Sequence, residues 1–143
     1  MRRKQLPADL VPAWEAFEAV LAEIEPAKAG LADVLPSTRL PGRPLGHALA
    51  EFADRLDRAS GLMPAWRVAA LENVWTACDT GLRRALVVAR GHLDRTPTPA
   101  GFEGMLGLIE SLLDPLEPFG AAEARFRSLR RRPRGRPRGQ DLV

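Results

Sequence analysis

The sequence is poor in the residues that most often carry chemistry, since its 143 residues include one cysteine, two histidines and no tyrosine. Cys78 alone cannot form an internal disulfide, which fits a reducing compartment. No apolar run approaches the ~20 residues that a bilayer-spanning helix needs. The first residues, MRRKQLPADL, are basic but lack the apolar stretch of a secretory signal. We therefore expect a cytoplasmic protein without a membrane partner.

Sequence motifs for enzymatic catalysis are also absent. There is no Gly-x-Ser-x-Gly segment, and Cys78 lies beside Asp79 in an apolar helical stripe, where a buried, inert thiol is expected. His47 and Glu51 share one helix face, but metal sites in helical bundles usually take Glu-x-x-His pairs from different helices, and this sequence has none. We therefore predict no enzyme, no metal site and no cofactor, and we interpret His47 as a surface histidine.

What is present is typical of a helical domain. Hydrophobic residues make up 45% and charged residues 27% of the chain. Apolar residues recur every three or four positions, whereas no segment alternates as a strand does. A chain of this length favours one domain with a modest core. We predict an all-α fold, an antiparallel bundle of about five helices.

Prolines and glycines divide the helical pattern into segments. We expect helices over residues 9–25, 26–35, 45–60, 64–94 and 98–116, and a last segment, 118–132, that is helical at first. Pro26 is expected to kink or restart the first helix, and Pro64 to lie in the first turn of its helix. Thr98 is expected to cap the next helix. Its three glycines, 101, 104 and 107, are interpreted as a strip for close helix packing rather than a phosphate cradle.

The net charge of +3 conceals an asymmetry along the chain. Residues 1–124 carry 13 Lys and Arg against 17 Asp and Glu, a net of −4, whereas residues 125–143 carry eight Arg and one Asp, a net of +7. We therefore divide the chain into a helical bundle domain, 1–124, and an Arg-rich tail, 125–143, expected to be disordered after about residue 132. A basic tail on an acidic body indicates a polyanionic partner, or contact with the body itself.

Arginine outnumbers lysine by 19 to two, and alanine occurs 22 times. Because Arg, Ala, Gly and Pro have GC-rich codons, we infer a GC-rich genome. This bias alone can produce strings of Arg, Pro and Gly, and a short motif in the tail has to be weighed against it.

The tail contains RRRPRGRPRG at residues 130–139, in which Pro133-Arg134-Gly135-Arg136-Pro137 resembles the core of an AT-hook. AT-hooks are short minor-groove motifs of chromatin-associated proteins, and the resemblance covers only this stretch. Gly135 has no side chain to obstruct the narrow groove of an A-tract. Arg134 and Arg136 can donate to adenine N3 and thymine O2 on the groove floor. The two prolines favour an extended backbone.

The arginines that flank this core are expected to contact phosphates, which adds salt-dependent affinity without sequence information. The predicted DNA-binding residues are therefore Arg130, Arg131, Arg132, Arg134, Gly135, Arg136 and Arg138. A single hook binds weakly, so a homo-oligomeric body that presents two tails would gain from effective concentration.

The resemblance implies a small DNA-associated protein, nucleoid or regulatory, whose tail binds the A·T-rich minor groove. The alternative is a helical adaptor, a protein-interaction module whose tail is solvated or binds polyanions non-specifically. RNA, an acidic protein partner and the acidic body of the chain itself all remain open as targets of the tail.

Overall fold

The computed structural model describes residues 6–36, 42–95 and 101–130, and all the regular structure in these ranges is helical. Its α-helices are α1 (Val11–Ala32), α2 (Leu45–Leu62), α3 (Glu72–Arg95), α4 (Gly101–Leu113) and α5 (Pro118–Ser128). Short 3₁₀ helices join or precede them: η1 (Ala8–Leu10), η2 (Met63–Trp66), η3 (Ala69–Leu71) and η4 (Asp114–Leu116). The all-α class is confirmed. The helices pack as four rods, slightly fewer than the expected five, because α4 and α5 together form one rod.

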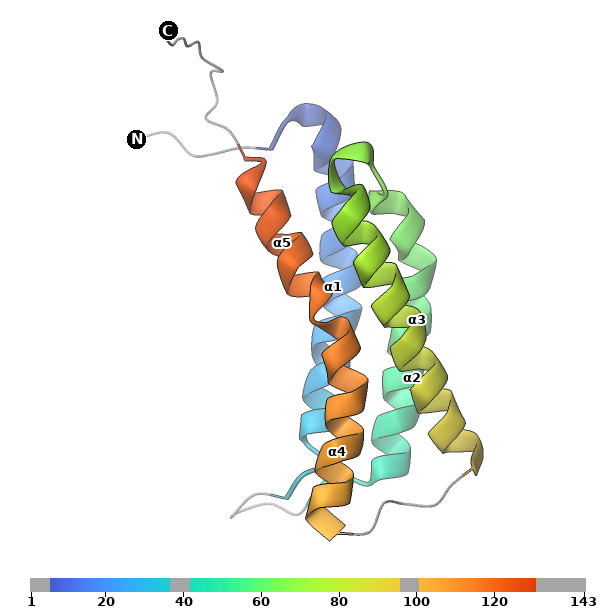
Figure 1. Ribbon diagram of the computed structural model, residues 1–143. Helices are drawn as coiled ribbons and strands as arrows, with labels where there is room; N and C mark the ends of the chain where they lie inside the picture. The colour runs from blue at the N-terminus through green and yellow to red at the C-terminus, as the bar shows by residue number, and fades with distance from the viewer. Residues whose placement is uncertain (1–5, 37–41, 96–100, 131–143) are drawn as a thin grey trace, which may run out of the picture.

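The helices form an antiparallel bundle of rods (Figure 1). The first three rods are α1, α2 and α3, which run alternately down and up, and the fourth is α4 and α5 joined through η4. Consequently α1 begins and α5 ends at the same end of the bundle, beside η2 and η3 (Figure 1). We call this end, made of residues 6–10, 63–71 and 126–130, the terminal pole.

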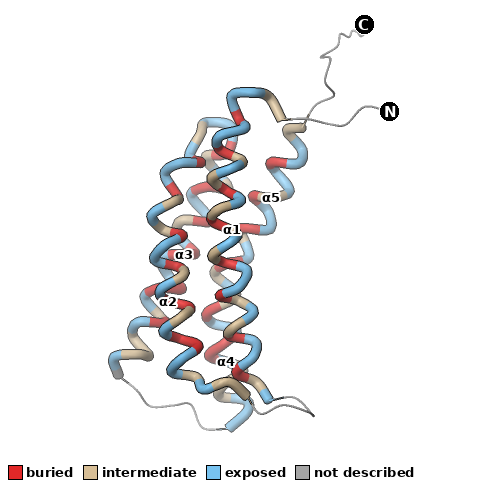
Figure 2. The backbone as a smooth tube through the Cα atoms, turned by 180° about the vertical axis from the view of Figure 1, so that it is seen from behind, coloured by how far each residue is buried: buried red, intermediate tan, exposed pale blue. Residues whose placement is uncertain are grey.

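Each rod buries one side, and the buried sides meet along the axis of the bundle (Figure 2). The core residues are all hydrophobic, and no polar or charged side chain is buried in the described part of the chain. The largest fully buried side chains include Trp66, Phe17, Phe52 and Phe126. Removal of this apolar surface from water is the main force that holds the rods together.

Pro26 does not end the first helix. The expected separate helix over 26–35 is wrong, because α1 continues through Pro26 to Ala32. Pro26 is on the exposed side, while Ile24, Ala27 and Leu31 on the other side are buried. Proline inside a helix costs about 3 kcal/mol, and burial of a leucine side chain contributes about 1.5–3 kcal/mol. Packing of the last two turns of α1 therefore offsets the proline.

The connection between α2 and α3 also differs from the expected helix at 64–94. Met63–Trp66 is a 3₁₀ turn, Arg67 and Val68 are extended, and α3 begins at Glu72 after η3. The buried Trp75 ring explains this corner, because its Nε1–H donates to the carbonyl oxygen of Met63 (2.8 Å). The chain must turn at this point to place Trp66 in the core, where its ring meets that of Phe17 edge-on.

At Gly81, the backbone of α3 comes close to the backbone of the fourth rod. A Cβ atom at Gly81 would overlap the carbonyl oxygen of Pro115 in η4, so only glycine fits there. By contrast, nothing lies within 4 Å of a Cβ built at Gly101 or Gly107. The interpretation of these two glycines as a strip for close packing is therefore wrong, and Gly101 instead adopts the left-handed φ of +75° at the start of α4.

The packed body extends beyond residue 124. α5 continues to Ser128, and the Phe126 ring is fully buried in the core. The expected Thr98 cap and the tail after Arg130 lie outside the described residues. None of the described helices is both long and apolar enough to cross a bilayer.

Candidate functional site

The predicted DNA-binding tail leaves the body at the terminal pole. Arg130 belongs to the described chain, and its backbone N–H donates to the carbonyl oxygen of Arg127 (3.2 Å). Its guanidinium carbon lies 5.3 Å from the centre of the Trp14 ring on α1, within the range of a cation–π contact. The other predicted site residues, Arg131, Arg132, Arg134, Gly135, Arg136 and Arg138, lie outside the described residues.

An aromatic cluster fixes the exit point of the tail. The Phe126 ring meets Trp14 edge-on at 5.1 Å and Phe17 at 5.0 Å between ring centres. The Trp66 ring completes the cluster from η2, 6.1 Å from Phe126. Aromatic pairs at such separations contribute about 0.5–1.5 kcal/mol beyond the area they bury. The last turn of α5 is therefore held firmly against α1, and Arg130 follows directly from it.

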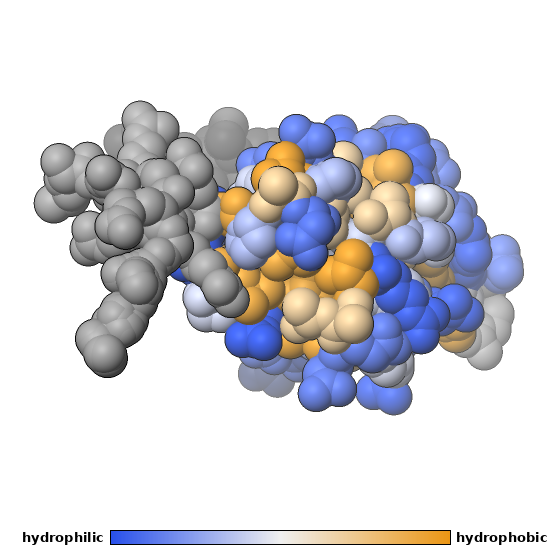
Figure 3. All heavy atoms as spheres, turned by 90° about the horizontal axis from the view of Figure 1, so that it is seen from above, coloured by the Kyte–Doolittle hydropathy of each residue, from blue (hydrophilic) through white to orange (hydrophobic). Residues whose placement is uncertain are grey.

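The terminal pole also carries apolar surface. Viewed end-on, hydrophobic residues gather near the point where the chain leaves the described body, with hydrophilic residues around them (Figure 3). Leu6, Val68 and Leu129 are half-buried residues of this pole and pack against the core.

The charged side chains of the body are mostly paired with one another. Ion pairs within the described residues engage Lys28, Arg43, Arg55, Arg58, Arg67, Arg83, Arg90 and Arg127. Among the described cationic side chains, this leaves Arg84, Arg125 and Arg130 without a carboxylate partner. The carboxylates left without one in the same ranges are Asp9, Glu15, Glu18, Asp33, Asp54, Asp94, Glu103, Glu110, Asp114 and Glu117. The uncompensated charge of the body is therefore mainly negative.

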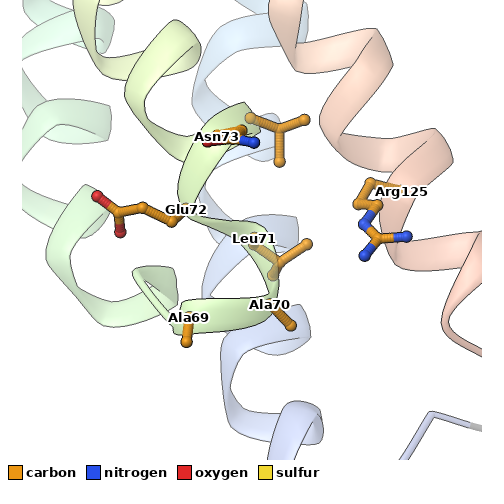
Figure 4. Close-up of a pocket in the computed structure, with 7 residues that line it drawn as sticks. Ala69, Ala70, Leu71, Glu72, Asn73 and Arg125 are labelled. Carbon is orange, nitrogen blue, oxygen red and sulfur yellow. The ribbon is translucent and has the colours of Figure 1, made fainter.

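A shallow groove runs along the seam between α3 and α5. Its upper part, about 350 Å³, lies between Ala69–Val74 and Arg125 (Figure 4). Its lower part, about 460 Å³, shares Asn73 and is lined by polar residues of α3 and by Asp114, Pro115 and Pro118. Two of the unpaired arginines, Arg125 and Arg84, line these two parts. Sequence reasoning missed this groove, because the packing of α5 on α3 creates it.

Glu72 in the upper part of the groove is already engaged. Two hydrogen bonds from Arg67 reach its carboxylate, at 3.2 and 2.8 Å, and they hold the pKa of Glu72 below its usual value. Arg67 also stacks on the Trp75 ring, 4.3 Å from its centre. These contacts close the corner between α2 and α3, so Glu72 is a structural ion-pair partner rather than a free base.

The structure explains the two candidate reactive groups of the sequence, Cys78 and the His47–Glu51 pair. Cys78 is fully buried, as expected, and desolvation together with the nearby Asp79 raises its thiol pKa to about 12. Glu51, the potential metal partner of His47, instead accepts hydrogen bonds from Arg43 and Arg55. Within the described ranges, no three His, Cys, Asp or Glu side chains are grouped to hold a metal ion.

Comparisons with known proteins found no matching family model, no similar curated protein and no similar solved structure.

Proposed function

We propose that this chain is a small DNA-associated protein, in which the helical body carries a basic tail that binds the A·T-rich minor groove. The observation that carries the proposal is the Pro133–Pro137 segment, an Arg-Gly-Arg core between prolines, with further arginines on both sides. Such a segment is slim enough for a narrow groove and supplies donors for its acceptors. A location at the nucleoid follows from this proposal.

The charge distribution supports the proposal. Residues 131–143 carry five Arg and one Asp, whereas residues 6–130 carry 13 Lys and Arg against 17 Asp and Glu. The body therefore has a net charge of −4 and is repelled by DNA as a whole, so attraction has to come from the segments outside it. The stacking of Arg130 on Trp14 keeps the start of the tail at one fixed place on the body.

The test is a pair of glycine substitutions in the full chain. Gly135→Val should weaken binding to an A·T-rich duplex at least tenfold, because a branched side chain obstructs entry to the narrow groove. Gly139→Val is the matched control, since it makes the same change outside the Pro133–Pro137 core. Both variants keep every arginine of the tail. The measurement is a titration of A·T-rich and G·C-rich duplexes over a series of salt concentrations.

The flanking arginines provide the second arm of the test. Arg131→Gln with Arg132→Gln should weaken binding to both duplexes alike, and reduce the slope of log K against log salt by up to ~0.9 per lost phosphate contact. If Gly135→Val binds both duplexes as the unaltered chain does, groove recognition is wrong and the tail acts only through its charge. That result would favour the adaptor alternative, or a tail that binds polyanions without selection.

A further inference from the structure

One side of α3 is exposed along most of the helix and consists mainly of small or uncharged side chains. Spacings of three, four and seven residues place its members on one face. They are all exposed: Asn73, Thr76, Ala77, Thr80, Arg84, Val87 and Asp94. Val87 is 72% exposed, more than any other large hydrophobic residue in the described part of the chain. From Asn73 to Thr80 this strip has no charged residue, and a low charge content is typical of the centre of a protein–protein interface.

The groove between α3 and the fourth rod runs beside this strip. Its lower part is bordered by Asp114 and Pro115, and its upper part by Arg125 (Figure 4). The carbonyl oxygen of Pro115 occupies the place of a Cβ atom at Gly81, so Asp114 stands near the level of Gly81 along α3. Arg125 stands near the level of Ala69–Val74. We call the strip together with Asp114, Pro115 and Arg125 the seam face.

The seam face carries four charged groups that have no ion pair within the described residues. Two are cations, Arg84 and Arg125, and two are carboxylates, Asp94 and Asp114. An acidic ligand would meet the two carboxylates, and a basic ligand would meet the two arginines. Both signs are satisfied together by a surface that carries the same charges in the reverse order. A twofold axis provides such a surface, because each copy then presents the same residues to the other.

We propose that a second copy of this chain docks on the seam face, with the two α3 helices antiparallel and the twofold axis close to Arg84. This inference does not depend on DNA binding by the tail. In this register, a residue that follows Arg84 by some number of positions lies opposite the residue that precedes it by the same number. Val87 of one copy therefore lies opposite Gly81 of the other, over the lower part of the groove. Each copy fills the groove of its partner with this valine.

The same register brings Arg84 of one copy to Asp114 of the other. Asp114 stands at the level of Gly81 and therefore faces the level of Val87 in the second copy. Arg84 of that copy is three residues away, about 4.5 Å along the helix axis. This offset is within the length of an arginine side chain, and the contact forms twice because of the twofold axis.

Arg125 and Asp94 meet in the same way at the two ends of the seam face. Asp94 follows Arg84 by ten residues and lies opposite Val74, which precedes it by ten. Val74 lines the upper part of the groove together with Arg125. In a parallel dimer, Asp94 and Arg125 would instead lie at opposite ends of the interface, about 30 Å apart, and stay unpaired. The charges of the seam face therefore favour the antiparallel dimer.

The experiment exchanges the charges of Arg84 and Asp114 in the full chain. Arg84→Asp alone leaves carboxylates facing each other across the dimer, and Asp114→Arg alone leaves cations facing each other. Each variant should therefore dimerise at least about tenfold more weakly than the unaltered chain. An equimolar mixture of the two variants should recover association, because opposite charges meet again in a mixed dimer. Pairing of Arg84 with Asp114 within one chain cannot produce this recovery. Sedimentation velocity over a range of micromolar concentrations measures the dimer fraction.

A second pair of variants tests the orientation of the two copies. Arg125→Asp and Asp94→Arg should also associate weakly alone and recover when mixed, because these groups meet only when the α3 helices are antiparallel. Val87→Asp should dimerise at least about tenfold more weakly than the unaltered chain, since it places a charge over the groove of the other copy. Recovery for Arg84 and Asp114 without recovery for Arg125 and Asp94 would overturn the antiparallel register.

The controls are Arg127→Asp and Glu18→Arg, which make the same changes of charge at exposed positions of α5 and α1 outside the seam face. Each control should dimerise alone as the unaltered chain does. Thermal melting checks that every variant keeps the fold. The proposal is overturned if the unaltered chain stays monomeric at hundreds of micromolar, or if the variants of the seam face dimerise no more weakly than the controls.

Discussion

Gly81 allows the backbone of α3 to touch the carbonyl oxygen of Pro115, which brings the broken fourth rod against the core. Leu82 and Ala85 next to it are fully buried, so the helix cannot rotate to make room for a side chain. Pro115 is also restricted, because its ring fixes φ at about −65°. Because both groups in this contact are backbone, no flexible side chain can move away to make room for a new Cβ atom.

We predict that Gly81→Ala destabilises the protein by about 1–3 kcal/mol, the usual cost of overpacking a core. The control is Gly107→Ala on α4, where nothing lies within 4 Å of the new Cβ atom. There the gain in helix propensity should stabilise the protein by about 0.5–1 kcal/mol. Urea unfolding of the two variants measures both effects, and a stabilised Gly81→Ala variant would contradict the backbone contact.

At the scale of single residues, the sequence predicted the burial of some side chains but not the exposure or the contacts of others. The expected burial of Cys78 is confirmed, and Phe17 and Phe52, which belong to the apolar residues at helical spacing, are buried as well. Phe102 is a large apolar residue of the same helical pattern, yet it is 56% exposed because it stands in the first turn of α4, beyond most of the core. In the sequence alone, Gly81 looks like a weak point of a helix. Its role depends on a backbone contact with Pro115, 34 residues away, which no local pattern shows.

At the scale of elements, a chain of ion pairs joins α1 to α2. Glu23 on α1 accepts hydrogen bonds from Arg55 and Arg58 on α2, both at 3.2 Å. Glu51 accepts one from Arg55 (3.0 Å) and one from Arg43 (2.5 Å), which lies two residues before α2. The Arg43 backbone N–H donates in turn to the carbonyl oxygen of Asp33 (2.8 Å). This network ties the end of the α1–α2 connection to both helices.

We predict that Glu51→Gln lowers the stability of the fold at pH 7. The variant should also lose less stability than the unaltered chain as the pH falls. Hydrogen bonds from Arg43, and then from Arg55, hold the pKa of Glu51 below its ordinary value of 4.5. The ionised carboxylate therefore stabilises the fold above pH 4.5, and this contribution disappears as the pH falls through the lower pKa of the folded state. Urea unfolding from pH 7 to pH 3 measures the difference.

Asp54→Asn serves as the control for this measurement. Asp54 is exposed on the same helix and has no ion pair within the described residues. Its variant should keep the acid dependence of the unaltered chain. The network is not a stabilising element if Glu51→Gln and Asp54→Asn unfold alike at every pH.

The sequence predicted the existence of the helices better than their ends. Spacing of apolar residues identifies a helix reliably, because one side of it must be buried. Pro26 and Pro64 gave the wrong boundaries, since proline affects the chain locally whereas tertiary packing decides whether a helix continues. Leu31 keeps α1 helical past Pro26, and Trp66 and Trp75 turn the chain after Pro64.

At the scale of the whole molecule, the charge asymmetry could be predicted from the sequence, but the terminal pole could not. An antiparallel bundle returns its last rod to the starting end only when the number of rods is even. Pro26 and Pro115 both look like places where the chain reverses, yet α1 continues through Pro26, and α5 continues the direction of α4 after Pro115 (Figure 1). A reversal at either proline would put the tail at the other end, so the position of the site depends on packing that no local signal shows.

The boundary between body and tail gives the last prediction, because the buried residue closest to the C-terminal end of the described chain is Phe126. A chain that ends at Arg130 should melt within a few degrees of the full chain, since it keeps the aromatic cluster and the stacking of Arg130 on Trp14. A chain that ends at Ala124 loses Phe126 and should be destabilised by at least about 3–5 kcal/mol, the usual cost of removing a buried phenylalanine side chain. Phe126→Ala in the full chain should reproduce most of that loss, whereas Arg127→Ala, on the exposed side of the same turn, should cost under about 1 kcal/mol. Calorimetry of these four proteins locates the end of the folded body, and a large loss on removing residues 131–143 alone would mean that the tail is part of it.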